Sequence, residues 1–195
     1  MSNQIDNEYF LKKEITFSLF KGILYSLFAS IFWIILNFSI LYAIHKQNYI
    51  IQKAFEDSVF IIEYFVLIFF SGIIIQELIK TIILITKAKV KLQHLKFGFS
   101  TSSLTPYIEC KYPVPIKAYK YTLIIPTIVI LQTIWLSYFF NLYEFIVYST
   151  FWLFFSMFDI ITFIMVKNYK KPYLATSHTE LPGIILYDNP FNEEL

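Results

Sequence analysis

Four long apolar stretches alternate with polar segments along the chain. They cover residues 22–44, 59–85, 121–140 and 142–166. Each has about the 20 apolar residues that a helix needs to cross a bilayer. The pattern therefore predicts an all-α membrane protein with about four transmembrane helices, organised as a single integral membrane domain over residues 1–195. The first stretch is too long and begins too late for a cleavable signal peptide, so we expect it to be retained as an anchor.

The segment 88–120 between the second and third stretches is predicted to contain a small β element. Apolar side chains approximate alternation there, as expected of a short hairpin or an edge strand. These side chains are Val90, Leu92, Leu95, Phe97 and Phe99. Residues 100–103 are predicted to form the turn, and Pro113 and Pro115 are expected to end any strand before the third stretch.

Two features near the end of the chain add local predictions. Asn141 lies between the third and fourth stretches, where we expect a tight turn. The apolar run 184–187 in the tail, residues 167–195, predicts a short strand that docks on the segment 88–120.

Composition supports the membrane class and excludes several others. Hydrophobic residues make up 57% of the chain and charged residues 15%, against roughly 45–50% and 25% in soluble domains. The net charge of +2 gives no reason to expect a nucleic-acid partner. Cys110 is the single cysteine, which excludes an internal disulfide. The bilayer itself is the partner that composition predicts.

Lysines predict the orientation of the helices. Thirteen of the sixteen lysines fall on one side of a four-helix topology: three before the first stretch, seven in 87–120 and three after the fourth stretch. Lys46 and Lys53 fall on the other side, and Lys80 lies inside a stretch. Because cytoplasmic loops carry the excess of Lys and Arg, we expect a multi-pass protein of the cytoplasmic membrane with both termini in the cytoplasm.

Polar residues inside the apolar stretches are the candidates for a functional site, because they are costly in lipid. They are Glu63, Gln76, Glu77, Lys80 and Asp159. Glu63, like Glu144, lies near the outer end of its stretch and is predicted to be an interface residue.

Lys80 and Asp159 lie at matched depths. Lys80 is seven residues before Lys87 and Asp159 eight before Lys167, so both sit roughly 10–12 Å from those flanks at 1.5 Å per residue. The two are predicted to pair, with Gln76 and Glu77 on the same side of the helix as Lys80. A structural ion pair with Lys80 reaching toward the headgroups and a functional polar site are both open.

A resemblance enters with the segment Gln76-Glu77-Leu78-Ile79-Lys80. It occupies the position of a His-Glu-x-x-His motif, in which two histidines one turn apart bind zinc and the glutamate polarises water. The chain resembles, over about residues 60–187, a family of bacterial membrane zincin peptidases of unknown function that look like compact relatives of site-2-protease-type enzymes. Further matching elements are Phe97-Gly98-Phe99, Pro106-Tyr107, Cys110-Lys111, Asp159 and a stretch from His178 to Gly183.

The resemblance implies a catalytic role for the motif, and the sequence departs from it where the metal would bind. Gln76 and Lys80 replace both histidines, which leaves Glu77 as a vestigial base and Asp159 as an orphaned third ligand. Glutamine is a poor zinc ligand and a protonated lysine has no free lone pair. We therefore expect no metal and no cofactor, and we expect Lys80 to offset the two carboxylates in place of the zinc.

Other chemistry has weaker support. His94, Cys110 and His178 would all be cytoplasmic, but their spacing is not typical of a metal site. Three functions stay open: a non-catalytic pseudoprotease that binds a transmembrane partner, an accessory or immunity-type structural membrane protein, and an active membrane metallopeptidase with an unrecognised site. We favour the first of these, and hence a chain that is not an enzyme.

Overall fold

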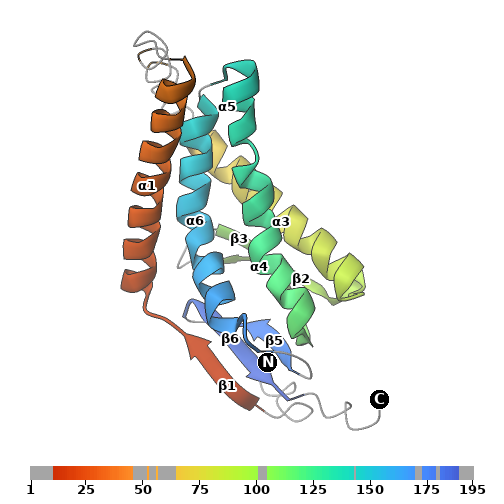
Figure 1. Cartoon of the computed structure of the whole chain (residues 1–195). Coiled ribbons are helices and arrows are strands. Elements are labelled where there is room, and N and C mark those ends of the chain that lie inside the picture. The colour runs from red at the N-terminus through yellow and green to blue at the C-terminus, as the bar shows by residue number, and fades with distance from the viewer. Residues whose placement is uncertain are drawn as a thin grey trace. The chain divides into compact units, whose positions relative to one another are not determined.

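The structure is a computed structural model that describes residues 11–45, 52, 56, 65–100, 105–142, 144–169, 173–178 and 181–188. Its long helices are shown in Figure 1. They are α1 (Leu19–His45), α3 (Phe65–Lys87), α4 (Ile116–Leu131), α5 (Ile134–Phe140) and α6 (Glu144–Val166), with a short 3₁₀ turn η1 (Leu92–His94). The strands are β1 (Leu11–Thr16), β2 (Leu95–Ser100), β3 (Thr105–Cys110), β4 (Val114–Pro115), β5 (Leu174–Ser177) and β6 (Gly183–Tyr187).

Three helical stretches among the described residues are long and apolar enough to cross a bilayer. They are Leu19–Ile44, Ile116–Phe140 and Phe145–Val166, and they match the first, third and fourth predicted stretches. The second stretch corresponds to α3, which is confirmed as a helix but is not among these three. Residues 59–64, and Glu63 with them, lie outside the described residues.

The third stretch differs from its prediction at both its start and its middle. The helix begins at Ile116 instead of 121, and it is interrupted between α4 and α5. Around the interruption, backbone amides donate to the carbonyl three residues earlier: Thr133 to Ile130 and Trp135 to Gln132. The Thr133 hydroxyl also donates to the Ile130 carbonyl, at 2.7 Å. These tight bonds replace the α-helical pattern for one turn.

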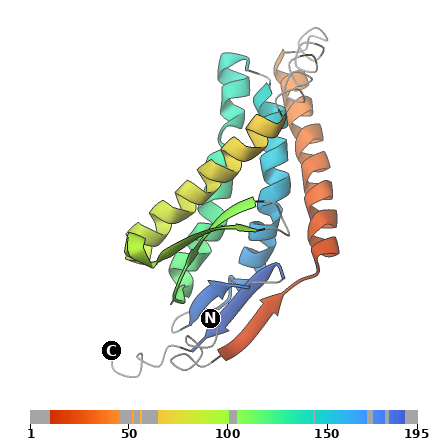
Figure 2. The ribbon, with the colours of Figure 1, turned by 180° about the vertical axis from the view of Figure 1, so that it is seen from behind.

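The predicted hairpin is confirmed as β2 and β3, an antiparallel pair that aligns Leu95 with Cys110 and Ser100 with Thr105. Figure 2 shows its two strands following the end of α3. The predicted turn at 100–103 lies largely outside the described residues. Asn141 has the left-handed conformation (φ 56°, ψ 32°) and ends α5, which confirms the tight turn expected there.

A four-stranded sheet, in the order β1-β6-β5-β4, is larger than the β element predicted from sequence. The predicted tail strand is β6, but it pairs with β1 and β5 and not with the hairpin. The tail still meets the segment 88–120, because β5 pairs with β4, and Ile184 and Leu186 of β6 share an apolar core with Ile116. Pro115 was expected to follow any strand and instead belongs to β4, which is tolerated because β4 is the edge of the sheet.

The chain divides into two compact units. The first, here called the sheet unit, holds the described parts of Met1–Leu19, Ile75–Pro126 and Asp159–Leu195. The second, the helical unit, holds those of Phe20–Ile74 and Thr127–Phe158.

The sheet unit has an apolar core beneath its four-stranded sheet, built from Ile15, Ile116, Leu123, Val166, Ala175, Ile184 and Leu186. Gly183 allows β1 and β6 to approach closely: its φ is +147°, and a Cβ there would lie 2.1 Å from the Ile15 carbonyl oxygen. Lys120 fixes the end of α6, since its ammonium donates to the carbonyls of Lys167 and Tyr169.

The helical unit is held by polar contacts between helices as well as by apolar packing. The Trp33 indole donates to the Ser149 hydroxyl at 3.0 Å, and the Tyr138 hydroxyl donates to Asn37 at 2.5 Å. Hydrogen bonds of this kind hold apolar helices together where the hydrophobic effect does not favour their association. Gly72 faces the buried ring of Trp152 in the same unit.

Candidate functional site

Helix α3 carries three of the predicted site residues on one side. Gln76, Glu77 and Lys80 are spaced so that a helix of 3.6 residues per turn brings their side chains together. Gln76 is buried, and Glu77 and Lys80 are partly buried. All belong to the sheet unit.

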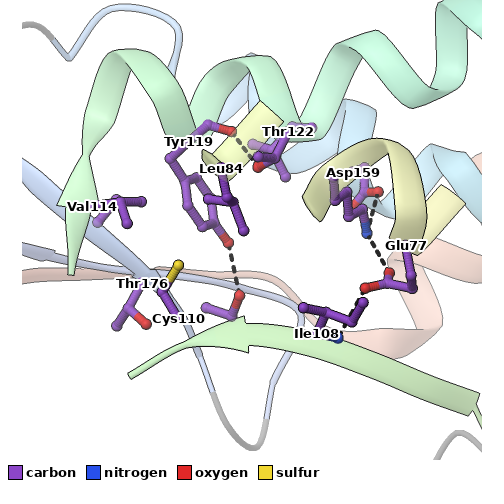
Figure 3. Close-up of a pocket in the computed structure, with 13 residues that line it drawn as sticks. Glu77, Leu84, Ile108, Cys110, Val114, Tyr119, Thr122, Asp159 and Thr176 are labelled. Atoms are coloured by element: carbon purple, nitrogen blue, oxygen red, sulfur yellow. Dashed lines mark hydrogen bonds and ion pairs between the residues drawn. The ribbon is translucent and has the colours of Figure 1, made fainter. Parts of the chain in front are cut away.

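Lys80 lies between two carboxylates. Its Nζ is 3.1 Å from Glu77 Oε1 and 3.2 Å from Asp159 Oδ2, and the side chains of Lys80, Glu77 and Asp159 are only 20%, 14% and 20% exposed. The pairing predicted from matched depth is therefore confirmed. Figure 3 shows Glu77 and Asp159 close together, with dashed lines that mark the contacts of both carboxylates.

Asp159 is also bound by Gln76, whose Nε2 donates to Oδ2 at 2.8 Å. The same carboxylate oxygen thus contacts both the Gln76 side-chain amide and the Lys80 ammonium. The side chains at positions 76 and 80, one helical turn apart, converge with Asp159 at a single point.

Glu77 has a second partner on the hairpin. Its Oε2 accepts the backbone N–H of Ile108 in β3 at 2.9 Å, as Figure 3 shows. Both carboxylate oxygens of Glu77 are therefore occupied, one by an ammonium and one by an amide. These two contacts fix the orientation of the carboxylate between α3 and β3.

A cavity of about 130 Å³ adjoins the ion pairs. At the charged end it is lined by Glu77, Lys80 and Asp159, and farther along by Cys110, Tyr119 and Ser177. The Tyr119 and Ser177 hydroxyls lie 3.0 Å apart and tie α4 to β5. Tyr119, Ser177 and the Ile108 amide were not predicted as part of the site, because no local sequence pattern links α4, β3 and β5.

The alternative metal site does not assemble. No three His, Cys, Asp or Glu side chains within the described ranges form a group able to hold a metal ion. His94 stacks edge-on against Tyr112, Cys110 lines the cavity, and His178 lies 3.8 Å from Glu14. Glu180 and the side chain of Glu144 fall outside the described residues.

Comparisons of the chain with protein-family models, with curated proteins and with solved structures find no match.

Proposed function

We propose that the chain is a multi-pass membrane protein of the zincin peptidase type that has lost its metal and binds a membrane partner without cutting it. The apolar helices support the membrane part of the proposal. The charged site and its cavity are where we place the vestigial chemistry.

The observation that carries the proposal is the convergence of positions 76, 80 and 159. Two positions one helical turn apart and a carboxylate on another helix meet at one oxygen atom. A zincin requires this arrangement of ligands, with the base at position 77 beside it. Here an amide and an ammonium stand where two imidazoles would be.

The same contacts argue against catalysis. Lys80 brings a positive charge to the point where a divalent cation would sit, so the two would repel. Asp159 is the one remaining zinc ligand of the motif, whereas a catalytic zinc normally has three protein ligands. Glu77 is held by Lys80 and by the Ile108 amide.

Zinc analysis tests the proposal. The wild-type protein, purified in detergent, should carry far less than one zinc per chain. The double substitution Gln76→His with Lys80→His should restore a His-Glu-x-x-His motif and raise the content to one zinc per chain. Metal content is measured by mass spectrometry after dialysis against a fixed free-zinc concentration.

Two controls define the outcome. Gln76→His alone keeps the ammonium and should not bind zinc, and Asp159→Asn in the double variant should release it. One zinc per wild-type chain would show that the chain is not a metal-free relative. A folded double variant without zinc would contradict the zincin geometry.

The proposed topology places both termini and the segment 88–120 in the cytoplasm, from the thirteen-to-two lysine distribution. A phosphatase reporter fused after Leu195 should therefore be inactive, and a cytoplasmic fluorescent reporter at the same point should be bright. An active phosphatase fusion would reverse the orientation.

A further inference from the structure

Exposed lysines and exposed large apolar side chains occur together between α3 and α4. We call this group the basic–apolar surface; it consists of Lys89, Lys91, Leu92, Phe97, Lys111 and Tyr112. The three lysines are exposed, and the exposed fractions of Leu92, Phe97 and Tyr112 are 63%, 66% and 47%. A surface of this kind needs an explanation, because large apolar side chains are usually buried when they cluster.

Several contacts join the η1 turn to residues 111–112, although the two are far apart along the chain. The His94 ring packs edge-on against Tyr112, with ring centroids 5.5 Å apart. The Lys111 ammonium donates to the Gln93 carbonyl, and the Lys111 amide donates to the His94 carbonyl, both at 2.9 Å. The turn at η1 and residues 111–112 are therefore neighbours.

The segment is strongly basic. Residues 88–120 contain six lysines and one acidic residue, Glu109. The register places Glu109 opposite Lys96 in the hairpin, away from Lys89 and Lys91 along the chain. The positive charge is thus concentrated around the η1 turn.

The segment also leads directly into an apolar helix. Tyr112 is four residues before Ile116, where a stretch long and apolar enough to cross a bilayer begins. If that stretch crosses the membrane, the bilayer surface is within reach of the η1 turn and of Tyr112.

We infer that the basic–apolar surface binds the anionic lipid headgroups of the bilayer, with its lysines at the phosphates and Leu92, Phe97 and Tyr112 in the boundary below them. Lysines alone would suit any polyanion, but exposed leucine and phenylalanine suit a bilayer and not a nucleic acid. The inference rests on the membrane insertion in the proposed function and is independent of the zincin relation.

Spin labelling of the full chain in lipid nanodiscs tests the inference. The label is placed at Gln93→Cys, an exposed position within the surface, with Cys110→Ala removing the native thiol. Leu181→Cys in the β5–β6 turn, 48% exposed, is the reference position. Accessibility to oxygen and to an aqueous nickel complex is compared between phosphatidylcholine discs and discs containing phosphatidylglycerol.

The label at position 93 should become more accessible to oxygen and less accessible to nickel when phosphatidylglycerol is present, whereas the label at 181 should not change. Each lysine near an anionic surface favours contact by roughly fivefold, so Lys89→Gln with Lys91→Gln should lower the ratio of docked to free surface by on the order of twentyfold. Lys13→Gln with Lys167→Gln, which removes two exposed lysines outside the segment 88–120, should leave the response intact. High salt should abolish it.

Equal accessibility at position 93 in both kinds of disc would overturn the inference, as would an equal loss in the two double variants. A response to added oligonucleotide in phosphatidylcholine discs, without a response to phosphatidylglycerol, would assign the surface to a soluble polyanion instead. Failure of the chain to co-purify with the discs would contradict the membrane insertion itself, which separates that failure from the others.

Discussion

Gly72→Ala is expected to destabilise the protein, although alanine normally favours a helix over glycine. A Cβ at position 72 would lie 1.4 Å from one carbon of the Trp152 ring and 1.9 Å from another. Trp152 is 1% exposed and packs with Ile73 and Ile130, so the ring has little room to move. The clash therefore requires a shift of helix or side chain.

Magnitudes decide the sign of this effect. Alanine gains about 1 kcal/mol over glycine in a helix interior. Overpacking a core typically costs about 1–3 kcal/mol and occasionally more, and the overlap with Trp152 is severe enough to expect the upper end. The free energy of unfolding in detergent should fall by roughly 2 kcal/mol.

The tryptophan provides the control. Trp152→Leu should itself be destabilising, because it leaves a cavity, but in that background Gly72→Ala should be neutral or stabilising. A loss from Gly72→Ala that is the same with and without the tryptophan ring would rule out the clash as its cause.

The helices were predictable because length and apolarity are local properties. Long apolar runs predicted α1 and α6 to within three residues at each end, and the alternation around Phe97 predicted the hairpin. Asn141 was a sound turn signal because asparagine tolerates the left-handed conformation.

The four-stranded sheet was not predictable because its strands depend on distant partners. The sequence of β1 is half charged, and it forms a strand by pairing with β6 more than 160 residues away. The strands β4 and β5 are too short for a pattern. The interruption before α5 has neither proline nor glycine, and the Thr133 hydroxyl bond that accompanies it forms only in the folded chain.

The site was predictable where it depended on local helix geometry and unpredictable where it depended on distant segments. Matched depth brought Lys80 and Asp159 together correctly, because depth follows from helix rise alone. The partner of the second Glu77 oxygen is a backbone amide, which every residue except proline possesses, so nothing in the sequence marked Ile108. The cavity needed α4, β3 and β5 to meet.

Lys80→Met is expected to destabilise the protein more than Gly72→Ala does. It removes the ammonium that lies within 3.2 Å of two carboxylates and leaves Glu77 and Asp159 without a positive charge between them. Breaking a buried pair by removing one partner costs about 3–5 kcal/mol. Because these side chains keep 14–20% exposure, we expect roughly 3 kcal/mol, the lower end of that range.

A double-mutant cycle with Asp159→Asn distinguishes pairing from simple packing. Asparagine keeps an acceptor for Gln76 and removes one of the two negative charges. The Lys80→Met substitution should therefore cost less in the Asp159→Asn background, with a coupling energy on the order of 1–2 kcal/mol. The free energies are measured by denaturation in the same detergent.

Lys87→Met is the matched control, since Lys87 is an exposed lysine at the end of the same helix. It should change stability by less than about 0.5 kcal/mol, as surface substitutions usually do. If Lys80→Met and Asp159→Asn were simply additive, Lys80 would act through its alkyl chain and not its charge. The view that an ammonium replaces the metal as the counter-ion of Glu77 and Asp159 would then fail, because that role requires the lysine and the aspartate to depend on each other.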